Sequence, residues 1–179
     1  MADPRDLVFI SLENWDDIWR RNQFLCASYS QRYPDAKILF VGLARDVSNR
    51  LRLGRLGDLR RGADSPPGLP NITITQPIKL LPNSLSWGRK INQAMFRAHV
   101  RREARRLELS APPRWPKPPP AVHMVGRMGE SAVVYDITDD WISLTQSPAL
   151  TRLIAAQDAE LCRKADAVIV CSQKLHDLK

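Results

Sequence analysis

A short apolar segment that ends in carboxylates most constrains what this chain can fold into. Residues 133–137 are apolar and rich in β-branched side chains, a pattern typical of a strand buried in a parallel sheet. The segment stops at Thr138-Asp139-Asp140, residue types that favour turns and helix N-caps. Because open α/β sheets bind ligands beyond the carboxyl ends of their strands, Asp139 and Asp140 are candidate site residues. Spacing leaves open the alternative that one of them only caps the next helix.

Strand-like and helix-like segments alternate along the whole chain. We expect strands at residues 7–12, 37–43, 71–75, 133–137 and 165–171. We expect helices at residues 15–33 with Asn14 as N-cap, 84–109, 121–128 and 148–163, and one helical turn at 51–59. This order predicts the α/β class, with a Rossmann-like, open, mainly parallel sheet and helices on both faces. A length of 179 residues suits a single domain, residues 1–179.

Glycine and cysteine positions argue against several kinds of site. The first strand-to-helix turn, residues 13–16, contains no glycine, and no GxxxxGK motif occurs in the chain. A nicotinamide dehydrogenase or a P-loop enzyme is therefore not expected. The three cysteines, Cys26, Cys162 and Cys171, form no CxxC pair, so neither a disulfide framework nor a zinc site is indicated. We expect no cofactor.

The net charge of +8 is unevenly distributed. Residues 45–62 hold six arginines against two aspartates, and residues 86–109 hold seven Lys/Arg against Glu103 and Glu108. The basic helix at 84–109 suggests attraction to an anionic membrane surface, with a merely solvated helix face as the alternative. We expect Ile91, Phe96, Val100 and Leu107 to be buried, so that insertion into lipid is not needed.

The N-terminal residues and the lengths of the apolar stretches bear on the localisation of the protein. Residues 1–12 hold too few apolar residues for a signal-peptide core, and the longest apolar stretches are only strand-length. A cytoplasmic protein is expected, with a peripheral position on the inner face of the plasma membrane as the finer hypothesis.

Four stretches, taken in order, match a known pattern. They are Asn14-Trp15-Asp16 with Trp19, Arg21 and Gln23; Pro77, Pro82 and Asn92; Val134-Tyr135-Asp136 with Asp139-Asp140; and Ala165–Ser172 with Leu175. In these residues the chain resembles the N-terminal half of two-domain bacterial glycosyltransferases of the B type (GT-B), close to those that build surface polysaccharides. The resemblance covers nearly the whole chain.

The chain departs from this family in two places. The family's fourth strand would fall at Trp115 and Pro118, inside a segment with six prolines in residues 110–120, so that strand is expected to be short, distorted or lost. The sequence ends at Lys179, before the family's C-terminal domain, which binds the nucleotide sugar. We therefore expect half an enzyme, inactive without that domain.

The resemblance implies sugar transfer from a nucleotide-sugar donor to a saccharide or lipid-linked acceptor, in cell-surface polysaccharide biosynthesis, without a metal. The N-terminal domain then supplies the acceptor pocket. The matching acceptor-binding residues are Asn14, Trp15, Asp16, Arg21, Gln23, Asp136 and Ser172. Asp139 or Asp140 would hydrogen-bond or deprotonate an acceptor hydroxyl. Several of these residues also have a purely structural alternative. Trp15 could belong to the core, and Arg21 and Gln23 could form hydrogen bonds with neighbouring residues of the helix. Asp136 could accept hydrogen bonds from the backbone of an adjacent loop.

Other functions remain open. The chain could be a non-catalytic Rossmann-like binding or regulatory domain. A basic nucleic-acid-binding protein is disfavoured, because few aromatic residues lie among the arginines and no known module occurs. The spacing Asp136-x-x-Asp139-Asp140 could also hold a divalent ion, although it is not the usual DxD.

Overall fold

A computed structural model describes residues 5–47, 64–83, 85–143 and 147–179. The chain forms two compact units, Met1–Ser110 and Ala111–Lys179. Parallel strands with flanking helices make up both units. The predicted class, Rossmann-like α/β with mainly parallel strands, is therefore confirmed.

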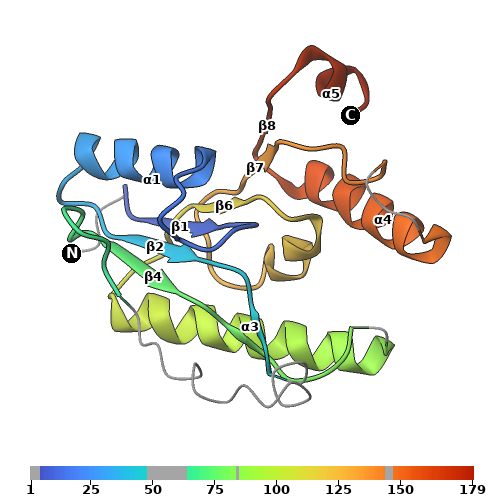
Figure 1. The fold of residues 1–179 in the computed structure, drawn as a ribbon, viewed down its shortest axis with the longest axis horizontal. Coiled ribbons are helices and arrows are strands. Elements are labelled where there is room, and N and C mark those ends of the chain that lie inside the picture. The colour runs from blue at the N-terminus through green and yellow to red at the C-terminus, as the bar shows by residue number, and fades with distance from the viewer. Residues whose placement is uncertain (1–4, 48–63, 84, 144–146) are drawn as a thin grey trace. The chain divides into compact units, whose positions relative to one another are not determined.

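The first unit is organised around three parallel strands in the order β4-β2-β1. These are β1 (Leu7–Ile10), β2 (Ile38–Val41) and β4 (Ile72–Thr75). The register places Ile10 beside Val41, and Val41 beside Thr75. Every residue of β1 and β2 is buried, because α1 (Arg21–Arg32) and α3 (Ser86–Arg106) cover opposite faces of the sheet (Figure 1). The rings of Phe9 and Phe40 stack with their centroids 5.7 Å apart.

Helix α1 begins six residues later than the sequence indicates. The predicted N-cap, Asn14, is wrong, because residues 11–20 form a loop and the N-cap is Arg20. A capping box fixes this start: the Gln23 side chain accepts a hydrogen bond from the Arg20 amide at 3.1 Å. Asn14 is instead engaged across the sheet, where its Oδ1 accepts from the Leu43 amide at 3.0 Å.

Helix α3 is confirmed, but it turns a different face inward. Its buried residues are Gly88, Asn92, Val100, Glu103 and Ala104. The predicted burial of Val100 is confirmed. The predicted burial of Ile91 is wrong, since Ile91 is 43% exposed. Asn92 fixes the rotation of the helix: its Oδ1 accepts from the amides of Leu80 and Leu81, both at 3.2 Å.

A small parallel pair was not predicted in the first unit. Strand β3 (Arg45–Asp46) pairs with β5 (Ile78–Lys79), and Lys79 Nζ lies 2.5 Å from Asp46 Oδ2. Strand β3 opens the arginine-rich stretch at residues 45–62, and β5 follows Pro77. The helical turn expected at residues 51–59 lies outside the described residues.

The second unit contains β6 (Arg114–Pro116), the 3₁₀ helix η1 (Pro119–Met124), β7 (Val134–Ile137), α4 (Pro148–Lys164), β8 (Ala167–Val170) and α5 (Gln173–Asp177). Strands β7 and β8 are parallel, and a parallel bridge joins Arg114 to Val133. The proline-rich segment thus keeps a strand, but a short one. The core gathers Tyr135 and Ile137 of β7 with Leu161 of α4.

Within the described residues, no helix combines the length and the apolar character needed to cross a bilayer.

Candidate functional site

The carboxyl ends of the three parallel strands of the first unit lie level with one another. The Ser11 amide donates to the Val41 carbonyl, and the Gly42 amide donates to the Thr75 carbonyl, both at 2.9 Å. The loops that follow β1, β2 and β4 therefore start from one edge. This edge is where α/β sheets bind their ligands.

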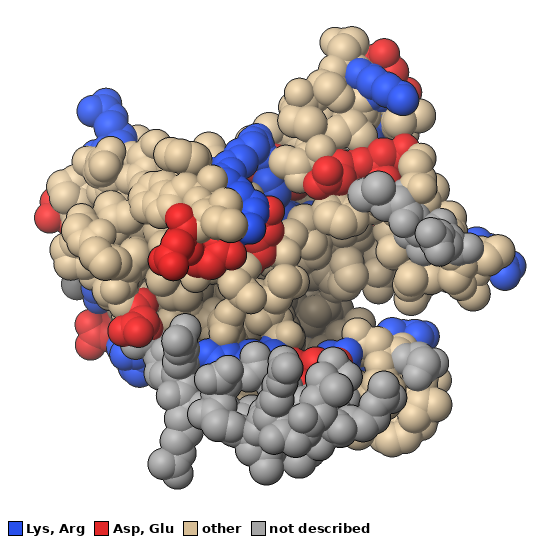
Figure 2. Space-filling view, viewed as in Figure 1, with Lys and Arg blue, Asp and Glu red and all other residues tan. Residues whose placement is uncertain are grey.

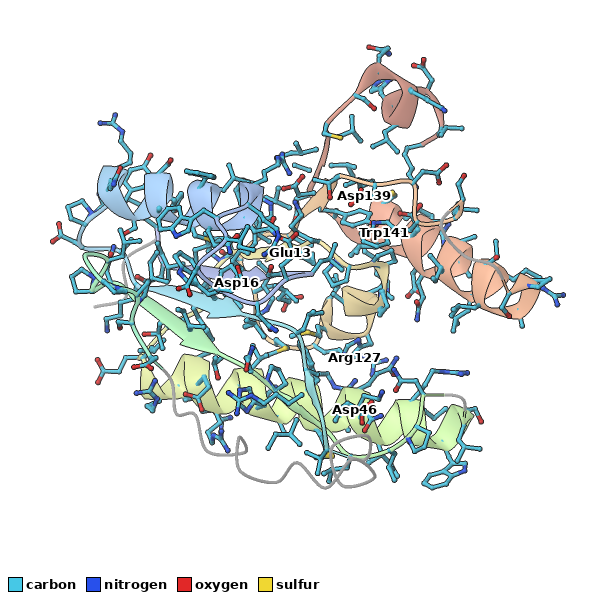
Figure 3. All side chains as sticks on the ribbon, viewed as in Figure 1. Glu13, Asp16, Asp46, Arg127, Asp139 and Trp141 are labelled. Atoms are coloured by element: carbon cyan, nitrogen blue, oxygen red, sulfur yellow. The ribbon has the colours of Figure 1, made fainter. Side chains whose placement is uncertain are left out.

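A buried polar group supports the loop after β1. The Asn22 side-chain amide donates to Ser11 Oγ at 3.0 Å and to Glu13 Oε2 at 3.1 Å. Ser11 Oγ also accepts from the Glu13 amide at 3.0 Å. Ser11 and Asn22 are 3% and 4% exposed, so their polar groups are satisfied inside the protein. They hold the Glu13 carboxylate at the edge of the sheet (Figure 3).

An acidic and a basic side chain face solvent beside Glu13. Arg20 Nη1 lies 3.0 and 3.1 Å from the two carboxylate oxygens of Asp16. Arg20 Nε lies 3.7 Å from Glu13 Oε1. Asp16 Oδ1 also accepts from the Ile18 amide at 3.1 Å, which fixes the loop locally. Two carboxylates and one guanidinium are thus held together, with Asp16 exposed (Figure 3).

Asn14 ties the loop after β1 to the loop after β2. Its Oδ1 accepts from Leu43 after β2, and its carbonyl accepts from the Gln23 side-chain amide at 3.4 Å. Gly42 makes this approach possible, because a Cβ there would lie 3.0 Å from Asn14 Oδ1 and 3.5 Å from Gln76 Cγ. Asn14 and Gln23 therefore act on the backbone of the loop, and their positions make them supports of the site.

Three aromatic rings extend from the core to the surface at this edge. Trp15 packs edge-on against Phe40, with centroids 5.0 Å apart, and meets Trp19 at 5.8 Å. Trp19 meets Phe24 at 5.2 Å. Trp15 is half-buried, whereas Trp19 and Phe24 are 42% and 57% exposed. Trp15 thus packs against the core beneath Trp19, and the Trp19 ring is exposed to a ligand.

The second unit buries one of the predicted site residues. Asp136 is 0% exposed, and its Oδ2 accepts from Lys117 Nζ at 3.1 Å and from Trp115 Nε1 at 3.3 Å. Lys117 is itself only 2% exposed. A buried carboxylate needs such a cation, because burial of an unpaired charge is costly. Asp136 therefore joins β7 to the segment after β6, and Lys117 was not predicted.

The other predicted carboxylates lie in the loop after β7. Asp140 accepts from the Ser143 hydroxyl and, at 3.4 Å, from its amide. These hydrogen bonds, the hydroxyl bond first, lower the pKa of Asp140. Asp139 is exposed and accepts from Thr138 Oγ1 at 2.9 Å (Figure 3). Neither residue caps α4, whose N-cap is Ser147.

Two predicted residues lie at helix starts. Ser172 is the N-cap of α5, and its Oγ accepts from the Leu175 amide at 3.3 Å. Arg21 is exposed at the first residue of α1. Asn14, Trp15 and Asp16 thus lie in the loop after β1, with Gln23 in the first turn of α1. In the second unit, Asp136 lies within β7, Asp139 and Asp140 follow β7, and Ser172 follows β8. In the described ranges, no His, Cys, Asp and Glu side chains form a group of three able to hold a metal.

The sequence analysis missed Glu13, Arg20 and Asn22. Glu13 directly follows the apolar run at residues 7–12, so its position after a predicted strand was a usable signal. The role of Asn22 depends on a contact eleven residues away, which no local pattern shows.

Comparison with known proteins leaves the family open, since no protein-family model matches this chain and the search of curated proteins finds no match either.

Proposed function

We propose that this chain is the acceptor-binding half of a glycosyltransferase, acting on a saccharide or a lipid-linked acceptor in cell-surface polysaccharide biosynthesis. The observation that carries the proposal is the cluster of Glu13, Asp16 and Arg20 beside the exposed ring of Trp19, at the carboxyl edge of the first sheet. We call this cluster the edge site.

The chemistry of the edge site suits a sugar. A pyranose ring presents hydroxyl groups around its rim and an apolar C–H face. Carboxylates accept hydrogen bonds from hydroxyls, and a guanidinium donates them with fixed geometry. The Trp19 ring offers an apolar surface with exposed area for stacking. Because Glu13 and Asp16 are already oriented by neighbouring groups, binding loses little side-chain entropy.

The carboxylates after β7 are assigned a separate role. The Ser143 hydroxyl bond lowers the pKa of Asp140, which makes its carboxylate a weaker proton acceptor than an unperturbed aspartate. Asp140 is thus better suited to orient an acceptor hydroxyl than to remove its proton. Asp139 is exposed and is the better candidate for a base. The nucleotide sugar would be bound by a second domain, and no cofactor is invoked.

Saccharide binding tests the proposal. The chain would be screened on an array of bacterial oligosaccharides, and hits would be measured by calorimetry. Trp19→Ala should weaken binding by about fivefold, since stacking contributes roughly 1 kcal/mol. Asp16→Asn should weaken it by a similar factor, because a charged acceptor is lost.

Matched controls come from the same unit. Trp87 is 54% exposed on α3 and Asp35 is exposed after α1, so Trp87→Ala and Asp35→Asn remove the same groups elsewhere. Both should leave saccharide affinity unchanged. The absence of any saccharide ligand, or equal losses in the test and control variants, would contradict the proposal.

A further inference from the structure

The solvent face of α3 carries apolar side chains at one end and basic ones at the other. Positions spaced by three or four, such as 87, 91, 94, 98, 101 and 105, are exposed. The full exposed set is Ser86, Trp87, Lys90, Ile91, Ala94, Ala98, Arg101, Arg102, Arg105 and Arg106. Trp87 and Ile91 are 54% and 43% exposed, on successive turns. Since the opposite face, with Val100 and Ala104, is buried on the unit, these two large residues are not part of the core.

Two leucines extend this apolar surface at the start of α3. Leu85, the residue before the helix, is 43% exposed, and Leu80 is 46% exposed. The Leu80 amide is bonded to Asn92 of α3, so the loop is fixed to the helix. We name Leu80, Leu85, Trp87 and Ile91 the apolar patch. Exposed large side chains grouped in this way mark an interaction surface.

The charge on α3 is almost entirely positive. The helix holds seven Lys/Arg and one acidic residue, Glu103. Glu103 is buried and is bound by Arg102 and Arg106, each at 2.9 Å. Burial would raise the pKa of Glu103, but these hydrogen bonds outweigh it and lower the pKa. No carboxylate of α3 therefore faces outward, and Lys and Arg side chains are visible along the helix in Figure 2.

We propose that α3 docks the first unit on an anionic lipid bilayer. The apolar patch enters the headgroup region, and Lys90, Arg101 and Arg105 lie against lipid phosphates. Interfacial helices combine apolar and aromatic side chains with Lys/Arg in this way, and tryptophan is favoured at the headgroup level. The earlier expectation of purely electrostatic attraction is thereby extended, because Ile91 and Trp87 are available for insertion.

Charge also argues for this occupant over a second copy of the chain. Two such faces would bring Lys90, Arg101 and Arg105 of one copy against the same cations of the other, with no exposed carboxylate of α3 to offset them. An anionic bilayer complements the cations and accepts the apolar patch at once. The proposal goes beyond the edge site and does not depend on it, because it needs no sugar to be bound.

Vesicle partitioning tests the proposal with the chain as it stands. Vesicles of phosphatidylcholine alone and of phosphatidylcholine with phosphatidylglycerol would be sedimented with the protein. Binding is expected only to the anionic vesicles, and it should weaken as salt rises and the Debye length shrinks from about 10 Å at 0.1 M toward 3 Å at 1 M. Arg101→Gln with Arg105→Gln should lower the partition coefficient by roughly 25-fold, about fivefold for each cation.

The apolar part is tested separately. Trp87→Ser with Ile91→Ser should weaken partitioning by at least tenfold, while Ile18→Ser with Phe24→Ser, at exposed apolar residues elsewhere, should not. Arg32→Gln with Arg163→Gln is the charge-matched control. Equal binding to neutral vesicles, equal losses in the control variants, or self-association that the α3 variants abolish without any vesicle binding would each overturn the assignment.

Discussion

Removal of the buried cation at position 117 should destabilise the second unit strongly. Lys117 and Asp136 are 2% and 0% exposed and lie 3.1 Å apart. Lys117→Met leaves the Asp136 carboxylate buried without this partner, and loss of one member of a buried pair costs about 3–5 kcal/mol. Because a domain's whole stability is about 5–15 kcal/mol, this loss is large enough to measure directly.

Hydrogen exchange can assign the loss to the second unit. Amides of β7 should exchange roughly two to four orders of magnitude faster in Lys117→Met, while those of β2 in the first unit serve as an internal reference. Lys117→Met with Asp136→Asn removes both charges and keeps an oxygen for the Trp115 indole N–H, so most of the protection should return.

The matched control is an exposed pair in the same unit. Lys164 and Glu160 are 2.6 Å apart with side chains 46% and 43% exposed, so Lys164→Met should change stability by less than about 0.5 kcal/mol. Unchanged exchange of β7 in Lys117→Met, or a double variant as unstable as the single one, would refute the reasoning.

Three further outcomes are expected. Burial, and then the nearby Arg102 charge, lower the pKa of His99, so just below pH 6.5 the unfolded state binds more protons than the folded state. The free energy of unfolding should therefore fall as the pH drops through that region. Urea titrations of His99→Gln should show a smaller fall. Gly88→Ala would place a Cβ 2.7 Å from the Pro82 carbonyl, so the first unit should lose about 1–3 kcal/mol by thermal unfolding; an unchanged melting temperature would argue against the tight contact. Residues 1–179 alone should show no sugar transfer above a heat-killed control with a panel of nucleotide sugars, since the proposed donor side lies in another domain.

Strands were predictable from the sequence because the apolar side chains of a buried strand are consecutive in the chain. The apolar runs at residues 7–12, 37–43 and 133–137 correspond to β1, β2 and β7, and Pro77 follows the end of β4. The start of α1 was not predictable in this way, because the Asn14 side chain accepts a hydrogen bond from the amide of Leu43, 29 residues away, and does not cap the helix.

The inward face of α3 and the buried pair Lys117–Asp136 could not be predicted, because both depend on contacts between segments that are distant in the sequence. Ile91 fits an apolar stripe by spacing, but Asn92 turns α3 toward the loop at residues 80–83 and leaves Ile91 outside. Lys117 lies between two prolines in a segment that reads as exposed, and lysine is rarely buried. Its partner Asp136 is 19 residues away, so no local pattern indicates the pair.

The most direct test of the central claim is an NMR titration of the ¹⁵N-labelled chain with a saccharide found on the array. If the chain binds its acceptor at the edge site, the amide signals that shift should be those of residues 13–24, with Leu43 and Gln76 from the neighbouring loops. Shifts confined to other parts of the chain, or none at saturating saccharide, would contradict the assignment of the edge site.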